Sequence, residues 1–86
     1  MADWFVYMVR CSDNSLYTGV TTDTRRRVQQ HNDQIPGAAK YTRTRQPVSL
    51  VYQEFYQTRS EACRREYEIK ALSKRAKEQL VLRSKH

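Results

Sequence analysis

Five residues of this chain carry the functional groups that cleavage of a phosphodiester bond requires: Tyr7, Tyr17, Arg27, His31 and Glu66. A carboxylate can hold Mg²⁺, an arginine can stabilise the negative charge of the transition state, and a phenol or an imidazole can take a proton from water. These residues lie far apart in the sequence. They can act together only if the fold brings them to one place.

Each of these residues also has a simple structural explanation. Tyrosine is an ordinary strand residue, so Tyr7 and Tyr17 fit a packing role. Glu66 fits a helix rim where a lysine or arginine pairs with it. Arg27 fits a structural salt bridge, and His31 fits the C-terminal end of a helix, where the dipole favours it. Residue type alone therefore leaves both interpretations open.

A β-hairpin within residues 4–20 should position the two tyrosines. With a two-residue turn, Tyr7 and Tyr17 would lie on opposite faces of the sheet. A three-residue loop with Asn14 in the left-handed conformation pairs Tyr7 with Gly19 and places both tyrosines on one face. We favour this second register because asparagine tolerates that conformation. Gly19 has no side chain, so it would leave the phenol of Tyr7 uncrowded.

Two helices place a charged residue on the side that should face the body of the protein. In the helix predicted for residues 24–31, Arg27 and His31 flank the only apolar residue, Val28. In the following long helix, Glu66 lies within the apolar stripe. We therefore expect the phenols, the arginine, the histidine and the carboxylate to converge on one face of the sheet.

The pattern of apolar residues and turn residues predicts an α+β fold, a three-stranded antiparallel sheet with flanking helices in the order ββαβαα. A single domain over residues 1–86 is expected from the length. The expected strands span residues 4–11, 15–20 and 48–56. The expected helices span residues 24–31 with Thr22 or Asp23 as the cap, about 60–72 with Ser60 as the cap, and 74–83, with a helical turn at 38–41.

The basic composition leaves two interpretations equally open: a nucleic acid as partner, or a positive charge that serves another purpose, as in many small basic proteins. Sixteen lysines and arginines against nine aspartates and glutamates give a net charge of +7, which suits a polyanion. No apolar run is long enough for a membrane helix and no signal pattern begins the chain, so we predict a cytoplasmic protein without membrane contact. Cys11 and Cys63 stand far apart without a histidine cluster, which indicates neither zinc nor a disulfide.

The loop predicted for residues 33–47 is rich in cations. Lys40, Tyr41, Arg43 and Arg45 combine positive charge with an aromatic ring, as in sites that bind a phosphate backbone. A solvated loop without a binding role explains the same residues equally well.

Short motifs occur in a fixed order from Val6 to about Leu82. They are Val6-Tyr7-Met8, then Tyr17-Thr18-Gly19, then Arg27 and His31, the loop segment GAAKYTRTRQPV, and the helical pattern of Ala62, Glu66, Ile69 and Lys70. This ordered set resembles the GIY-YIG nuclease domain. It is most similar to the small stand-alone bacterial members (YhbQ-like proteins), which are related to an excinuclease nuclease module. The first motif lacks the glycine and isoleucine of the family name, and no asparagine follows Glu66.

The resemblance implies a role for each residue. Glu66 would hold Mg²⁺, or another divalent cation such as Mn²⁺, and Arg27 would brace the scissile phosphate. Tyr7 would be the general base, with a pKa lowered by Arg27 and the metal. Tyr17 would position the phosphate or water, and His31 would assist proton transfer.

The resemblance also implies a metal-dependent endonuclease that acts on DNA, selects structure rather than base sequence and serves DNA repair. Such a small chain has little surface for contacts with the bases. An unidentified protein partner would then supply specificity. Two alternatives share these residues. One is an RNA-directed enzyme, and the other is a non-catalytic module that kept the fold and binds nucleic acid or protein.

Overall fold

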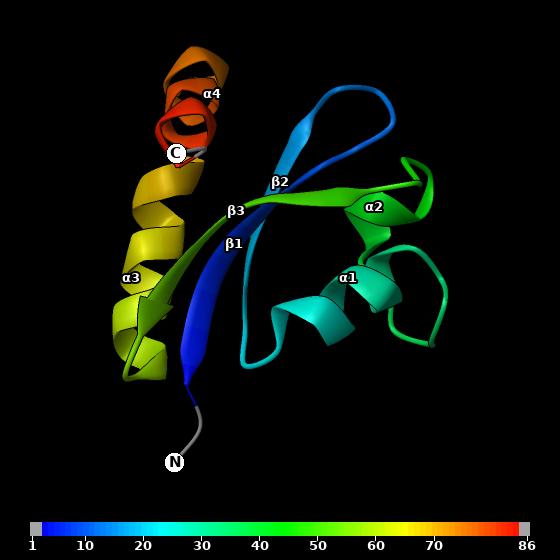
Figure 1. Ribbon diagram of the computed structural model, residues 1–86, viewed down its shortest axis with the longest axis horizontal. Helices are drawn as coiled ribbons and strands as arrows, with labels where there is room; N and C mark the ends of the chain where they lie inside the picture. The colour runs from blue at the N-terminus through cyan, green and yellow to red at the C-terminus, as the bar shows by residue number, and fades with distance from the viewer. Residues whose placement is uncertain (1–2, 85–86) are drawn as a thin grey trace.

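The computed structural model describes residues 3–84, and its centre is a three-stranded antiparallel sheet (Figure 1). Strand β1 (Trp4–Arg10) lies in the middle, between β2 (Leu16–Thr21) and β3 (Ser49–Tyr56). Both outer strands pair antiparallel to β1. The predicted α+β class and the order ββαβαα are confirmed.

Helices cover both faces of this sheet. Figure 1 shows α3 (Arg59–Lys70) and α4 (Lys74–Arg83) on one side, and α1 (Thr24–His31) and the short α2 (Lys40–Arg43) on the other. No helix in the described part of the chain is long and apolar enough to cross a membrane.

Side chains along β1 alternate between two separate hydrophobic cores, one on each face of the sheet. Val6 and Met8 are fully buried against α3 and α4, whereas Tyr7 and Val9 face the other way, towards α1. Because successive residues of a strand point to opposite faces, a central strand covered on both sides is almost continuously apolar. The sequence of β1, WFVYMVR, follows this rule.

The hairpin has the predicted register. Asn14 has a φ of 70°, in the left-handed region, and the amide of Cys11 donates to the carbonyl of Ser15 at 2.9 Å. Tyr7 is therefore paired with Gly19. The three-residue loop, rather than a two-residue turn, fixes which side chains reach each face.

The helix boundaries differ from expectation in α2 and α3, and α3 ends at Lys70 rather than near residue 72. α3 begins one residue earlier than expected, because Thr58, rather than Ser60, caps it by accepting from the amide of Glu61. The helical turn expected at residues 38–41 is α2 and begins at Lys40. The cap of α1 is Asp23, one of the two expected candidates. Cys11 and Cys63 are both free; Cys11 is buried and Cys63 is partly exposed.

Candidate active site

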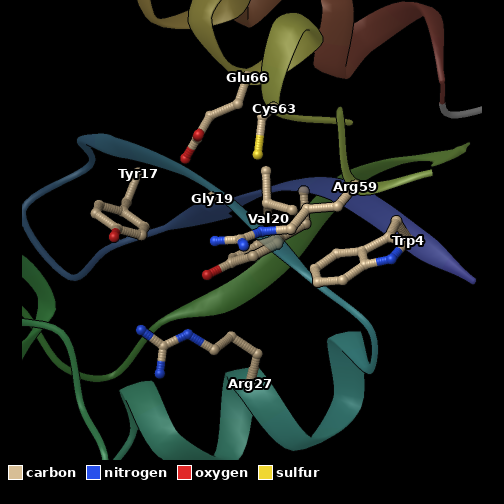
Figure 2. A pocket seen from close by; sticks show the side chains of 9 residues that line it. Trp4, Tyr17, Gly19, Val20, Arg27, Arg59, Cys63 and Glu66 are labelled. Atoms are coloured by element: carbon tan, nitrogen blue, oxygen red, sulfur yellow. The ribbon is translucent and has the colours of Figure 1, made fainter. Parts of the chain in front are cut away.

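A cavity of about 310 Å³ lies at the outer edge of β2 (Figure 2). Its lining residues come from β1, β2, α1 and α3, and they are Trp4, Tyr7, Tyr17, Gly19, Val20, Arg27, Arg59, Cys63 and Glu66. Four of the five residues that the sequence singled out are among them. The fifth, His31, lies outside this lining.

The cavity wraps around the edge of the sheet instead of lying on one face. Tyr7 and Tyr17 belong to the α1 side, whereas Glu66 comes from α3 on the opposite side. Figure 2 shows Glu66 extending from α3 and Arg27 from α1, with β2 between them. The expectation of a single face is therefore wrong. The groups meet because β2 is an edge strand, so helices on both faces reach past it.

Gly19 is required by the side chain of Tyr7. A Cβ atom at position 19 would lie 2.5 Å from the hydroxyl of Tyr7 and 2.7 Å from its Cζ. No side chain fits at that distance. The sequence-based expectation that Gly19 leaves room for the Tyr7 phenol matches this geometry.

Tyr7 belongs to a buried chain of hydrogen bonds. Thr42 Oγ1 donates its only proton to the carbonyl of Ala39 at 3.1 Å, so it must accept from His31 Nδ1 at 2.7 Å. The Nε2 atom of His31 then carries no proton and accepts from the hydroxyl of Tyr7 at 2.8 Å. His31 is fully buried behind Tyr7.

Burial sets the protonation state of both rings. It raises the pKa of Tyr7 to about 12, and the lowering effect of Arg27 is too small to offset it. Burial, with a smaller contribution from Arg27, lowers the pKa of His31 to about 4. The expected lowering of the Tyr7 pKa is therefore wrong for the protein alone. At neutral pH both side chains are uncharged.

The guanidinium of Arg27 is held at one end and open at the other. Its Nη1 donates to Gln30 Oε1 at 2.7 Å and to the carbonyl of Gly37 at 2.8 Å. Gly37 has a φ of 118°, which other residues rarely adopt. Nη2 and Nε donate to neither Gln30 nor Gly37. The guanidinium also lies near the Tyr7 hydroxyl, where it acts to lower the pKa of that phenol, so these two donors face the cavity and an anion bound there.

Glu66 is the only carboxylate among the lining residues. It pairs with Lys70 one helical turn later at 3.3 Å and keeps 26% of its side chain exposed. No group of three or more His, Cys, Asp or Glu side chains gathers as a metal site in residues 3–84. A single carboxylate in a water-accessible cavity fits Mg²⁺, which keeps several waters and takes substrate phosphates as further ligands.

Residues 3–79 match the family described as the GIY-YIG catalytic domain. This chain belongs to the GIY-YIG family. The predicted resemblance is thereby confirmed, and membership supports a nuclease-type function.

Two relatives match this GIY-YIG chain over almost its whole length. A UPF0213 protein of Staphylococcus haemolyticus is 53% identical over 94% of this chain and 96% of its own. A UPF0213 protein of Desulfotalea psychrophila is 55% identical over 91% of this chain and 70% of its own.

Two solved structures have the same fold. The solution NMR structure of a UPF0213 protein from Bacillus halodurans has a TM-score of 0.58 at 48% identity, covering 92% of this chain and 82% of that one. The solution NMR structure of a protein from E. faecalis has a TM-score of 0.62 at 35% identity, covering 100% of this chain and 95% of that one.

The sequence predicted four contacts to a phosphate backbone in the loop of residues 33–47. In the structure, two of these four side chains are held within the protein and two are exposed. The ring of Tyr41 stacks on Tyr17, with centroids 5.5 Å apart. The guanidinium of Arg45 lies 4.0 Å from the Tyr41 ring centroid and forms an ion pair with Asp13. Tyr41 and Arg45 are thus engaged within the protein. Lys40 and Arg43 are exposed, and neither forms an ion pair in the described residues.

Sequence reasoning missed the residues that hold the GIY-YIG site in place. Thr42 fixes the tautomer of His31, and Gln30 and Gly37 hold Arg27. Trp4 and Arg59 line the cavity without having been singled out. These residues act through tertiary contacts. Only Gly37 could have been noticed in the sequence, because a glycine in a loop indicates a backbone with positive φ.

Proposed function

We propose that this protein is a Mg²⁺-dependent endonuclease that hydrolyses phosphodiester bonds in DNA. The observation that carries the proposal is that Tyr7, Tyr17, Arg27 and Glu66, from four different elements, line one cavity of a GIY-YIG domain. A purely structural role for each residue would not require them to meet.

Glu66 would hold the divalent cation, Mg²⁺ or Mn²⁺, at the α3 side of the cavity. When bound, such an ion polarises a phosphate oxygen and favours the ionised form of a coordinated water. The partial exposure of Glu66 gives the ion access. Lys70 neutralises the same carboxylate from outside the cavity lining.

Arg27 would bind the scissile phosphate through Nη2 and Nε, because Nη1 is already used by Gln30 and Gly37. A guanidinium fixed in advance stabilises the extra charge of the pentacovalent transition state without reorganising. Tyr17 would add a hydrogen bond from its hydroxyl. Its ring is held in place by stacking on Tyr41.

Tyr7 would act as base by relaying a proton rather than by ionising first. A phenol with a pKa of about 12 is protonated at neutral pH, but its hydroxyl already donates to His31 Nε2 at 2.8 Å. The hydroxyl oxygen takes a proton from the attacking water while its own proton passes to His31. His31 thus ends with one extra proton, and Tyr7 stays neutral.

Two exposed cations favour recognition of DNA structure over recognition of base sequence. The exposed Lys40 and Arg43 suit contacts with phosphates, which carry no sequence information. A role in DNA repair and a protein partner that adds specificity agree with such a substrate. An RNA substrate would use the same residues.

Incubation of the protein with nicked, branched and single-stranded DNA, with Mg²⁺ or with EDTA, tests the proposal. We expect cleavage of at least one of these substrates in Mg²⁺ and none in EDTA. Binding that weakens steeply with salt but gives no cleavage in Mg²⁺ or Mn²⁺ would instead identify a non-catalytic nucleic-acid-binding module.

A further inference from the structure

We propose that the part of the cavity lined by Trp4 and Arg59 is a second subsite, in which Arg59 binds the phosphate next to the scissile one and Trp4 packs against the nucleobase. The inference rests on the proposed function, because it places the scissile phosphate between Arg27 and Glu66. It assigns a substrate-binding role to two residues that the proposed hydrolysis does not use.

Arg59 is a cation available to a ligand. It lines the cavity from the first residue of α3, and in Figure 2 its side chain reaches across the cavity from the side opposite Arg27. Arg10, Arg45 and Arg65 are paired with carboxylates, but Arg59 forms no ion pair within residues 3–84. A second unpaired guanidinium in one small cavity suits a second phosphate.

Trp4 supplies an aromatic surface beside this cation. It is only partly buried, packs with one side against the core, and lines the cavity. The guanidinium of Arg59 lies over its ring in a cation–π contact, with the guanidinium carbon 5.8 Å from the ring centre. An aromatic ring and an arginine in contact form the combination that binds the base and the phosphate of one nucleotide in unpaired strands.

The shape of the cavity provides a path between the two subsites. Tyr7 and Arg27 lie on the α1 side of β2, and Trp4 and Arg59 lie on the α3 side. Gly19 lies on β2 between them and lines the cavity without a side chain. A nucleic-acid strand crossing the sheet edge at Gly19 would therefore place successive phosphates at Arg27 and Arg59.

Fluorescence tests this subsite directly, because Trp4 is the only tryptophan of the chain. The protein is titrated in EDTA, without turnover, with a single-stranded oligonucleotide and with a fully abasic strand of the same length. We expect the normal strand to quench Trp4, since its bases can stack on the indole. The abasic strand should bind with much less quenching.

Variants of Arg59 test the phosphate contact, with binding measured by polarisation of a labelled strand. Arg59→Ala should weaken binding roughly tenfold and reduce the slope of log K against log salt by about 0.7. Arg59→Lys should restore most of the affinity. Arg75→Ala is the matched control, since it removes the same charge from an exposed position on α4. Equal circular dichroism and unfolding midpoints establish that the variants are folded.

Two results would overturn the inference: a Trp4 signal that is unchanged when the strand binds, or an Arg59→Ala affinity equal to that of Arg75→Ala. If the wild type cleaves DNA while either result holds, the subsite is wrong and the proposed function stands. If the Trp4 and Arg59 effects are as expected but no DNA is cleaved, the subsite stands as a binding site and the nuclease proposal fails.

Discussion

At the scale of single residues, the contact between Gly19 and Tyr7 links the sequence of β2 to the chemistry of the cavity. A methyl group on Gly19 would overlap the phenol of Tyr7, whose hydroxyl is bonded to His31. Gly19→Ala should therefore displace the Tyr7 hydroxyl from both the cavity and His31. We expect a loss of cleavage of at least tenfold and a destabilisation of about 1–3 kcal/mol, typical of an overpacked core.

Cleavage rates and thermal unfolding of the Gly19→Ala variant measure these two effects. An unchanged rate would mean that the position of the Tyr7 hydroxyl is unimportant for the reaction. That result would remove Tyr7 from the proposed proton relay.

His31 should make the stability of the protein depend on pH in a defined window. The ordinary pKa of histidine, near 6.5, applies to the unfolded chain, whereas burial lowers the pKa of folded His31 to about 4. Between these values the unfolded state binds a proton that the folded state does not bind. The free energy of unfolding therefore falls as the pH drops from 6.5 to 4, by up to about 1.4 kcal/mol per pH unit and roughly 3 kcal/mol in all.

Urea denaturation at a series of pH values measures this dependence, with His31→Gln as the comparison. The variant should be less stable at neutral pH and should lack the slope in this window. Glu54 and Glu78, whose pKa values are lowered by Arg65 and Arg10, begin to lose their contribution only below the ordinary glutamate pKa of 4.5. A wild-type stability that is flat between pH 6.5 and 4.5 would contradict the buried neutral His31.

At the scale of elements, the side chain of Asn32 connects the end of α1 to the residue that precedes β3. Asn32, directly after α1, accepts from the amide of Val48 at 2.6 Å and donates to its carbonyl at 2.9 Å. Asn32→Asp replaces the donor by a carboxylate that faces the carbonyl oxygen. We expect this variant to lose about 1–3 kcal/mol of stability, the cost of an unsatisfied and repelled polar group.

The matched control is Gln34→Glu, which makes the same amide-to-acid change two residues later on an exposed side chain. Chemical denaturation of both variants at neutral pH compares them. Equal stability of the two variants would show that the contact with Val48 does not hold α1 in place.

The elements and the hairpin register could be predicted because they depend on local signals. Asn14 and Gly19 indicate the loop and the pairing, and Asp23 is one of two expected caps. The sequence could not predict that Glu66 and Arg27 line one cavity at the edge of β2. This arrangement depends on which strand is outermost and on how far the helix on each face extends past that strand. The pKa of Tyr7 rises instead of falling because burial is a tertiary property.

At the scale of the whole molecule, size and charge limit what can be recognised. The longest extent of the described chain is 33 Å, about ten base pairs of a duplex. A protein that covers about one helical turn and has a net charge of +7 gains most of its affinity from phosphates. Binding should therefore be strong at low salt and weakly dependent on sequence.

The double variant Lys40→Ala/Arg43→Ala tests where this charge acts. Removal of two phosphate contacts should reduce the slope of log K against log salt on duplex DNA by about 1.8. Arg75→Ala/Lys77→Ala, on α4 at the other side of the sheet, is the control with the same loss of charge. Equal slopes for the two double variants would exclude a specific role for Lys40 and Arg43.

The central claim is that the cavity at the edge of β2 is a metal-dependent hydrolytic site held by Glu66. The most direct measurement compares DNA cleavage by Glu66→Gln and Glu68→Gln at saturating Mg²⁺. The two variants make the same change two residues apart on α3, and Glu68 lies outside the cavity lining. We predict that Glu66→Gln lowers the rate by about a hundredfold or more, while Glu68→Gln cleaves like the wild type. Equal rates for Glu66→Gln and the wild type would contradict the claim.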